Sequence, residues 1–597
     1  MARSSTPGGA RKRPSGATHS PSRRTSSSTP TKKKQSIGGN SAAYLKAAEA
    51  SGVDLSYWWP APAADELEKS SKYYRRCTRP VGEFMGNWGC FFWTMYIPLQ
   101  IYYFYGIVVL NKGNLMVPDS EFWYALLFEL PDGISIQPTW YCWKMIAVWC
   151  LLQFVMEAFL PCFFPFGQGY IEGVTLKNGR RLKYPMNGLT AFFLTHLIYF
   201  SACYYEVPLL GLKIEADFVW KHMGSLMTCA VLTSHFFALW LYVSWGVLWR
   251  RHVDEPSFEE DYGVFDFRNF WNDYFMGVAR NPRICHGSLW KKILPYAEDG
   301  FDLKRWWDGR TLTLWILLNW SYLAAQYYGC TLDRDTYEVT ATCDATGDWN
   351  RIGPASWFIA LTHAYYIFDY NWCEPAYLTT TDIRHDLFGF MLTYGMFGFL
   401  AMFYPVSFLG HLSGQGKGNE ITENYFFTTI GILMYLFGMF MFRWCNIEKH
   451  RFRTKVADLK AEYYEAVPND GGKSTLAGEA EYIAAGLRDY CIFGYNKPGD
   501  LKYLRTKEGS YLLFSGTWGY AKHFNYIGDL TMCVGWMIMC YSATHAWPVA
   551  PFGYVAYFWV MDIHRCGRDQ ERCAEKYGKD WDEYCKVAKW NILPGVY

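Results

Sequence analysis

The sequence lacks several features that would place it among familiar classes of soluble protein. Its 597 residues carry a formal net charge of only +2, which excludes a globally basic nucleic-acid binder and an acidic disordered chain. Its 18 cysteines are scattered through apolar segments and none forms a CxxC pair, so buried free thiols are favoured over a secreted disulfide scaffold. It also lacks an internal repeat of fixed period, which disfavours an inverted-repeat transporter.

What the sequence does contain is long runs of aromatic and apolar residues. Phe, Trp and Tyr make up 19% of the chain, and ten apolar stretches reach or approach the length needed to cross a bilayer. Because a segment in hydrocarbon must satisfy its own backbone hydrogen bonds, and each stretch is longer than a strand, we expect helices. The predicted fold class is all-α, a polytopic membrane protein of about ten transmembrane helices. The stretches are centred near Tyr96, Leu151, Leu194, Ser234, Leu317, Ala360, Phe397, Leu433, Gly535 and Val555.

The first 41 residues differ sharply from the rest of the chain. They are rich in Ser, Thr, Pro and Gly, contain no acidic residue, and cannot form a core. We expect residues 1–75 to form a disordered basic arm with an amphipathic lead-in. The arm could dock on anionic lipid or nucleic acid, could be phosphorylated within SPSRRTSSST, or could be a solvated tail that keeps the N-terminus cytosolic. Its basic residues are Arg3, Arg11, Lys12, Arg13, Arg23, Arg24, Lys32, Lys33 and Lys34.

The polar connections between the apolar stretches suggest an orientation. An even number of spans returns the C-terminus to the cytosolic side, and the basic segment at 449–507 fits that side. The connection at 329–351 is acid-rich and is expected on the opposite side or in a re-entrant hairpin. If it faces an oxidising lumen, Cys330 and Cys343 could form a disulfide; otherwise both remain free thiols.

Two basic residues mark the end of the eighth apolar stretch. Lys449 and Arg453 are four residues apart and therefore share one helical face at the cytosolic end. Such a pair can clamp a phosphate, with the arginine supplying a planar fork of donors. The positive-inside rule alone also predicts basic residues at this place.

Polar residues gather again around the last two apolar stretches. In LLFSGTWGYAKHFNYIGDL, glycines flank Trp518, and Asn525 and Tyr526 follow, so an indole face and hydrogen-bonding groups enter the ninth stretch together. In the C-terminal segment, five polar residues recur at helical spacing and predict one polar stripe, which suits a ligand wall or an amphipathic surface helix. The stripe consists of Asp569, Cys573, Tyr577, Asp580 and Tyr584.

A further polar cluster lies inside the apolar region, in YYIFDYNWCEPAYLTTTDIRHDLFGF. Ionisable residues at membrane depth are costly, so they mark functional sites or satisfied packing networks. Carboxyl groups and a histidine beside tyrosines could hold and donate protons. The cluster contains Tyr365, Tyr366, Asp369, Glu374, Asp382, His385 and Asp386.

These segments together resemble the sterol reductase family, whose members reduce ring or side-chain double bonds of sterols with NADPH. The resemblance covers about residues 167–597, with GYIEGVTLKNGRRLKYPMNGLTAF, DYFMGVARNPRI, LTTTDIRHDLFGFML, LLFSGTWGYAKHFNYIGD and RDQERCAEKYGKDWDEYC in the family's order. TDIRHDLFGF and KHFNYIGD look more like the Δ7 and Δ14 ring reductases than the C24(28) side-chain enzymes. FDLKRWWDGRTLTLWILLNWSYLAAQ, NGLTAFFLTHL and LPGVY are most similar to Δ7-sterol reductases (7-dehydrocholesterol reductases), whereas LTTTDI is nearer the Δ14 pattern.

The resemblance implies a division of labour along the chain. It places a sterol-binding part with eight helices at 76–448 and an NADPH-binding part at 449–597, which includes an insertion at about 455–500 and the last two helices. It also implies a multi-pass protein of the endoplasmic reticulum membrane with both termini cytosolic. Its expected partners are a sterol substrate, the lipid bilayer and other sterol-pathway enzymes, with no nucleic acid and no metal. The implied NADPH contacts are Lys449, Arg453, Leu513, Trp518, Asn525, Tyr526, Asp569, Cys573, Ala574, Glu575, Lys576, Tyr577 and Tyr584.

Reduction of an electron-rich alkene needs a proton donor as well as a hydride, and the expected acid pair or relay is Tyr366 with Asp569. Glu374 and His385 are supporting candidates. The chain departs from the family pattern in its membrane half, where GVARNPR has Ala279 in place of an acid and where Met396, Phe399 and Ala401 replace Asp, Trp and Pro. These departures concern substrate choice more than cofactor use.

Alternative functions remain open from the sequence. A membrane methyltransferase of the isoprenylcysteine type has loosely similar C-terminal helices around HRCGRDQERC. A Δ14-sterol reductase or a C24(28)-sterol reductase is an alternative within the family. A sterol-binding membrane scaffold like the lamin B receptor also joins a basic arm to this kind of membrane domain.

Overall fold

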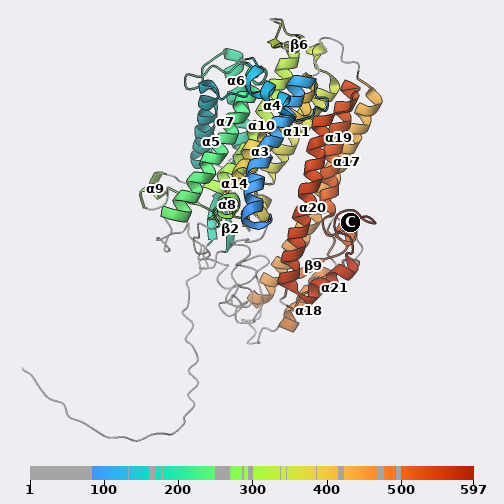
Figure 1. Ribbon diagram of the computed structural model, residues 1–597. Helices are drawn as coiled ribbons and strands as arrows, with labels where there is room; N and C mark the ends of the chain where they lie inside the picture. Colours follow the sequence, from blue (N-terminus) through green and yellow to red (C-terminus); the bar gives the residue numbers. More distant parts are fainter. Residues whose placement is uncertain are drawn as a thin grey trace, which may run out of the picture. The chain divides into compact units, whose positions relative to one another are not determined.

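The structure is a computed structural model, and Figure 1 shows its helices and strands. It describes residues 84–131, 133–160, 170–175, 181–248, 269–285, 288–293, 300–336, 338–344, 346–378, 380–384, 386–414, 423–466, 476–488, 490–492, 499–507 and 509–597. These residues belong to one compact unit, 37–597. The predicted basic arm at 1–75 lies outside the described residues.

Each of the ten predicted centres lies within a helical segment. The long helices are α3 (Gly86–Asn111), α5 (Trp140–Phe159), α6 (Gly188–Tyr205), α7 (Phe218–Leu241), α10 (Leu303–Tyr327), α11 (Pro354–Trp372), α17 (Tyr425–Ala466), α19 (Phe524–Thr544) and α20 (Val549–Tyr577). The seventh apolar stretch is a run of short helical segments, α14 (Phe390–Thr393), η6 (Tyr394–Leu400), α15 (Ala401–Pro405), η7 (Val406–Gly410) and α16 (His411–Gly414). The departures Met396, Phe399 and Ala401 all lie in this run.

Shorter helices connect or cover the long ones. They are α4 (Ser120–Tyr124), η1 (Ala125–Glu129), η2 (Tyr242–Leu248), α8 (Phe270–Met276), α9 (Ser288–Ile293), η5 (Trp349–Arg351), α12 (Glu374–Tyr377), α13 (Thr381–Arg384), α18 (Leu476–Arg488), η9 (Gly516–Gly519) and α21 (Lys579–Val587). Helix α18 belongs to the predicted insertion and packs against the far half of α17. Helix α17 itself runs without a break through residue 448, where the sequence suggests a functional boundary.

Five of the described helical segments are long and apolar enough to cross a membrane, judged by length and composition. They are Gly86–Asn111, Trp140–Phe159, Phe218–Leu248, Phe390–Ser413 and Tyr425–Tyr464. Helix α10 is not among them, because polar and charged residues along it lower its mean hydropathy; the four charged residues in its first turns are buried inside the protein. The protein is therefore a helical membrane protein, and the crossing of all ten helices stays a prediction.

The described strands form four antiparallel hairpins. They are β2 (Tyr170–Thr175) with β3 (Arg181–Pro185), β4 (Arg283–Ile284) with β5 (Phe301–Asp302), β6 (Thr331–Thr336) with β7 (Glu338–Thr342), and β8 (Tyr503–Arg505) with β9 (Tyr511–Leu513). Cys330 and Cys343 flank the third hairpin and are joined by a disulfide, so the pairing that the sequence left open is present. Figure 1 places this hairpin at the end of the helices opposite to α18 and α21.

Glycines bring α17 and α19 into backbone contact. Gly431 and Gly438 lie on α17, and Gly528 and Gly535 lie on α19, so both pairs are seven residues apart and share a helical face. A Cβ atom at Gly438 would lie 2.5 Å from the carbonyl oxygen of Gly528, and one at Gly535 would lie 2.7 Å from that of Gly431. Because nothing larger than hydrogen fits, the two helices lie side by side, as Figure 1 shows. This seam aligns the start of α19 with the later turns of α17.

Candidate functional site

The basic pair on α17 lies against the loop that precedes α19. The Lys449 ammonium nitrogen is 3.9 Å from the centre of the Trp518 ring, a cation–π contact. The Trp518 side chain is 3% exposed, and its Nε1–H donates to the carbonyl oxygen of Cys445 at 2.9 Å. The structure therefore brings these two residues together, with the ammonium group over the indole face.

A glycine gives this loop its shape. Gly516 has a φ of +60°, a left-handed conformation that favours glycine. The Glu448 carboxylate accepts hydrogen bonds from the Thr517 backbone N–H at 3.1 Å and from the Thr517 hydroxyl. A side chain at Gly516 would overlap that carboxylate. The loop that carries Trp518 is thus fastened to α17 one residue before Lys449.

The C-terminal stripe supplies the opposite wall, but not as one helix. Helix α20 ends at Tyr577, and Gly578, with a φ of +53°, turns the chain into α21. The prediction of a single continuous stripe was wrong at this glycine. Gly578 adopts a non-helical backbone conformation at little steric cost, and the stripe is interrupted there. Tyr584 nevertheless returns to the site, because its hydroxyl donates to the Leu513 carbonyl oxygen at 3.0 Å. Asp580 instead accepts from the Lys507 backbone N–H at 2.7 Å, in an exposed contact.

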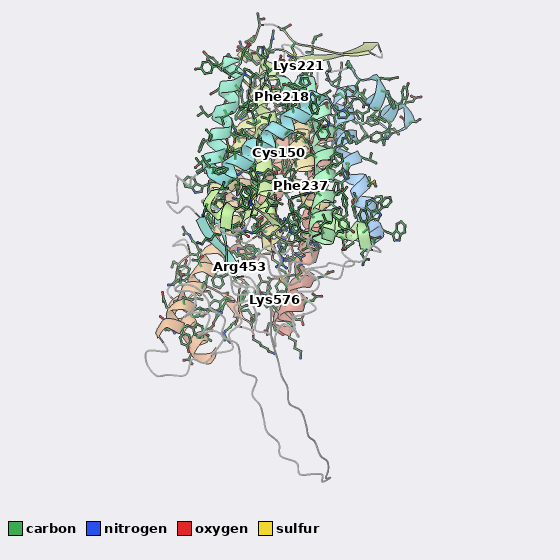
Figure 2. The ribbon with its side chains drawn as sticks, turned by 90° about the vertical axis from the view of Figure 1, so that its left-hand side faces the viewer. Cys150, Phe218, Lys221, Phe237, Arg453 and Lys576 are labelled. Carbon is green, nitrogen blue, oxygen red and sulfur yellow. A yellow bond between two sulfur atoms is a disulfide. The ribbon has the colours of Figure 1, made fainter. Side chains whose placement is uncertain are left out.

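The two cations share a carboxylate and a thiol as neighbours on this wall. Lys449 interacts electrostatically with Asp569 and Cys573, and Arg453 interacts with the same two residues. Arg453 also interacts with Tyr577 and Tyr584. Figure 2 shows Arg453 and Lys576 at the end of the molecule that lies away from Phe218 and Lys221. Residues 130 positions apart therefore meet at one end of the helices.

His523 and Asn525 connect the wall to the start of α19. His523 Nε2 lies 3.4 Å from an Asp569 carboxylate oxygen, and its ring stacks on Tyr526 with centroids 5.0 Å apart. Burial lowers the pKa of His523 to about 4; the charge of Asp569 opposes this and nearby cations add to it. The Oδ1 atom of Asn525 is buried and has no hydrogen-bond partner among the described residues. An orphaned amide oxygen is an acceptor available to a ligand such as a carboxamide.

Most of the predicted cofactor residues therefore lie together. Cys573 packs with Tyr577 and Tyr584 beside Leu512, and burial raises the pKa of the Tyr584 hydroxyl. Ala574 and Glu575 are exposed, and the Lys576 ammonium group lies 5.0 Å from the Tyr577 ring centre. Two cations, an orphaned amide and several aromatic rings suit a ligand that combines phosphate with flat polar rings.

Tyr366 lies deeper, near two carboxyl groups. It interacts electrostatically with Asp529 on α19 and Asp562 on α20. Asp562 is 4% exposed, and its Oδ2 atom has no hydrogen-bond partner in the described part of the chain. Asp569 lies two helical turns beyond Asp562 on the same face of α20, about 10 Å along its axis. Sequence reasoning missed Asp562, although a single aspartate in the apolar run YVAYFWVMDIH is a detectable signal.

The other predicted acid–base residues occupy different positions. Glu374 forms an ion pair with Arg305, and its second oxygen accepts from the Gly188 backbone N–H at 2.9 Å. His385 lies outside the described residues. Asp382 pairs with Arg565 at 3.0 Å.

Asp386 joins the same connection to α20 more tightly. It pairs with Arg568 at 2.9 Å and with Arg572 at 3.3 Å. Burial alone would raise the pKa of Asp386, but the surrounding cations lower it to about 2. Next to it, Phe388 N–H donates to the Ala279 carbonyl oxygen at 2.7 Å, so Ala279, where the family has an acid, takes part here through its backbone.

Comparisons with known proteins agree with one another. Residues 79–597 match the model of the "Ergosterol biosynthesis ERG4/ERG24 family". The chain is 29% identical over 506 residues to a Delta(14)-sterol reductase of Methylotuvimicrobium alcaliphilum, covering 84% of this chain and 93% of that protein. It is 28% identical to a Delta(14)-sterol reductase of Dictyostelium discoideum, over 89% of this chain and 95% of that protein. It is 27% identical to 7-dehydrocholesterol reductase of Xenopus laevis, over 85% and 91%.

Proposed function

Since the chain belongs to the ergosterol biosynthesis ERG4/ERG24 family, we propose that it reduces a ring double bond of a sterol with NADPH in sterol biosynthesis. The observation that carries the proposal is the meeting of Lys449 and Arg453 with the α20 wall at Asp569 and Cys573. This polar site, called the cofactor site below, lies at the end of an apolar helix bundle. Such a position suits a water-soluble cofactor that reacts with a membrane-dissolved substrate.

The contacts around the cofactor site support a role for each of its residues. Lys449 and Arg453 would hold phosphate, including the 2′-phosphate that distinguishes NADPH from NADH. Trp518, Asn525 and Tyr526 would hold the nicotinamide end, where the orphaned Asn525 oxygen supports a hydrogen bond to a carboxamide. When bound, NADPH supplies the hydride.

The proton would come from Tyr366. Its phenol is a weak acid and needs a carboxyl group to replace the proton that it gives away. Asp529 and Asp562 are its neighbouring carboxyl groups and, in their protonated form, would supply that proton, while Asp569 would connect them to the polar end of α20. Glu374, ion-paired with Arg305, would support the substrate side, and the same role is proposed for His385.

We propose the Δ7 bond as the one reduced, because the segments around FDLKRWWDGRTLTLW and LPGVY are most similar to Δ7 enzymes. The Δ14 bond is the second candidate. It is favoured by the names of relatives in Methylotuvimicrobium alcaliphilum, Dictyostelium discoideum and Ascobolus immersus, all Delta(14)-sterol reductases. We further propose ten membrane-crossing helices in the endoplasmic reticulum membrane, with both termini and the cofactor site on the cytosolic side.

The test is expression in two yeast strains, followed by sterol mass spectrometry. One strain lacks its own Δ14-sterol reduction. The other lacks both of its later sterol reductions and is supplied with a sterol that carries the Δ7 bond. Loss of the Δ7 bond supports the proposal, and loss of the Δ14 bond moves the assignment to the second candidate. Unchanged sterols in a strain that contains the protein would overturn the reductase proposal.

The cofactor role has its own test in purified protein. The double variant Lys449→Ala, Arg453→Ala should raise the KM for NADPH at least about 100-fold, since each of the two charge-assisted phosphate contacts contributes about 1.5–3 kcal/mol, and should change the KM for NADH much less. Lys455→Ala is the matched control, because Lys455 lies two residues beyond Arg453 and points to another side of α17. Equal effects on the two cofactors would remove the 2′-phosphate role.

A further inference from the structure

The first turns of α10 carry a buried polar cluster next to the proposed reaction site. Arg305 and Asp308 are each 1% exposed, although both carry charge. The Asp308 carboxylate accepts a hydrogen bond from the Tyr377 hydroxyl through Oδ2, and the Arg305 guanidinium pairs with Glu374 through Nη2. The Tyr370 ring packs edge-on against Tyr377, with centroids 5.1 Å apart. These five residues, from α10, α11 and α12, are called the α10 cluster below.

The α10 cluster has unused hydrogen-bonding atoms. Nε and Nη1 of Arg305, and Oδ1 of Asp308, are buried without a hydrogen-bond partner among the described residues. Leaving such an atom unsatisfied costs about 1–3 kcal/mol, and more where the group is charged. Unused donors and an unused acceptor therefore lie within one turn of the same helix, which is typical of a binding site and not of a satisfied packing contact.

A glycine keeps the guanidinium in this position. A Cβ atom at Gly309, one turn beyond Arg305, would overlap Arg305 Nη1. The guanidinium therefore occupies the space that a side chain at Gly309 would fill, while Nη2 reaches Glu374. Side chain and backbone together hold the unused N–H groups in place.

The charges of the α10 cluster determine the charge of the group that it can bind. Arg305 is compensated by Glu374, and Asp308 interacts electrostatically with Lys304, whose ammonium group donates to the carbonyl oxygens of Ile383 and Asp386. Because these two cations and two anions balance one another, a charged ligand group such as phosphate would leave an uncompensated buried charge. A hydroxyl group is neutral, accepts from the arginine and donates to the aspartate, so it uses both kinds of unused atom.

We propose that the α10 cluster binds the ring hydroxyl group of the sterol, and this inference rests on the proposed function for its substrate. Tyr370 lies one turn after Tyr366 on the same face of α11, about 6 Å along the axis. A hydroxyl bound beside Tyr370 places the fused rings of the sterol toward Tyr366, where the proton is to be delivered. The cluster thereby fixes which carbon of the ring system lies beside the phenol.

The experiment compares two substrates that differ only at the hydroxyl. kcat/KM is measured with saturating NADPH for a 3β-hydroxysterol and for the same sterol with hydrogen at that carbon. The wild-type protein should prefer the hydroxysterol by about 10- to 100-fold, the range expected when a charged group loses its hydrogen-bond partner. In Arg305→Lys, which keeps the charge beside Glu374 but removes Nε and Nη1, the preference should fall to about threefold or less, mainly through KM. Asp308→Asn should reduce it in the same direction.

Arg310→Lys is the matched control. Arg310 is also buried on α10 and also pairs with a carboxylate, that of Glu157, through both Nε and Nη2. This variant should lower activity on both sterols alike and leave their ratio unchanged, since a general loss of packing affects both substrates. A wild-type ratio near one, or a ratio that survives in both Arg305→Lys and Asp308→Asn, would overturn the inference and assign the unused atoms to bound water.

Failure of the proposed function would be recognised separately. If the wild-type protein reduces neither sterol, the same ratio is measured by equilibrium binding of the two tritiated sterols to protein in detergent. A hydroxyl preference in binding that Arg305→Lys abolishes and Arg310→Lys keeps would support the site without the reaction. Equal binding of both sterols would overturn it.

Discussion

Replacing Gly516 with alanine should disturb the wall that holds Trp518. A non-glycine residue at a φ of +60° costs about 1–2 kcal/mol in backbone strain. The new Cβ would also overlap the Glu448 carboxylate, which accepts two hydrogen bonds from Thr517. If the carboxylate or the loop moves away, one or both of these bonds are lost, at about 1.5–3 kcal/mol each. The expected total for Gly516→Ala is therefore about 2.5–8 kcal/mol, and it arises two residues from Trp518.

Two measurements separate this effect from general damage. Binding of NADPH, followed by quenching of tryptophan fluorescence, should weaken at least about tenfold, which needs only about 1.4 kcal/mol of the loss to appear in binding. The apparent Tm in detergent should fall. Gly567→Ala is the control, because Gly567 lies in α20 with nothing within 4 Å of its added Cβ. Alanine there should leave binding unchanged and raise stability slightly.

The outcome that refutes the reasoning is specific. If Gly516→Ala binds NADPH and unfolds as the wild type does, the loop is not held by Glu448 in this conformation. A fall in Tm with unchanged NADPH binding would keep the strain argument and separate the Trp518 loop from the cofactor.

Two further predictions concern charge. Because burial lowers the pKa of His523 from 6.5 to about 4, the unfolded chain takes up a proton in this range that the folded protein does not; stability should fall as the pH drops from 6.5 to 4, by about 3 kcal/mol from this residue. His523→Gln should flatten that part of the profile of Tm against pH, and an unchanged profile would contradict the assignment. A double-mutant cycle of Asp386→Asn and Arg568→Gln should give a coupling energy of about 1–3 kcal/mol in unfolding. Asp386→Asn should be the more damaging single change, because it removes an ion pair from both Arg568 and Arg572. A coupling near zero would show that the pair contributes nothing.

The sequence predicted the helices well because their signal is local. Each of the ten apolar stretches lies in a helix, since length and hydropathy are read within one segment. The break between α20 and α21 was missed because polar spacing continues through Gly578, and a helical stripe does not reveal a glycine that turns the chain. Residue patterns singled out Lys449, Trp518 and the C-terminal stripe, and the family resemblance implied that they bind NADPH. The meeting of Lys449 with Trp518, 69 residues apart, is a tertiary contact that no periodicity contains.

The buried charges of α10 were the least predictable part. Arg305, Asp308 and Glu374 come from segments separated by more than 60 residues, and the sequence shows only charged letters beside tryptophans. Whether such charges face water, lipid or one another is decided by neighbours that the local sequence does not name. The sequence also could not decide whether Cys330 and Cys343 form a disulfide, because this pairing depends on the redox compartment as well as on the chain.

The glycine seam between α17 and α19 limits how the protein can move. Backbone-to-backbone contact at positions seven residues apart on both helices opposes sliding of one helix past the other. The two helices therefore behave as a single strut. Loading of the proposed cofactor site and arrival of the substrate can then be communicated where this strut meets neighbours such as α11 and α20, and a hinge should be sought there and not within the strut itself.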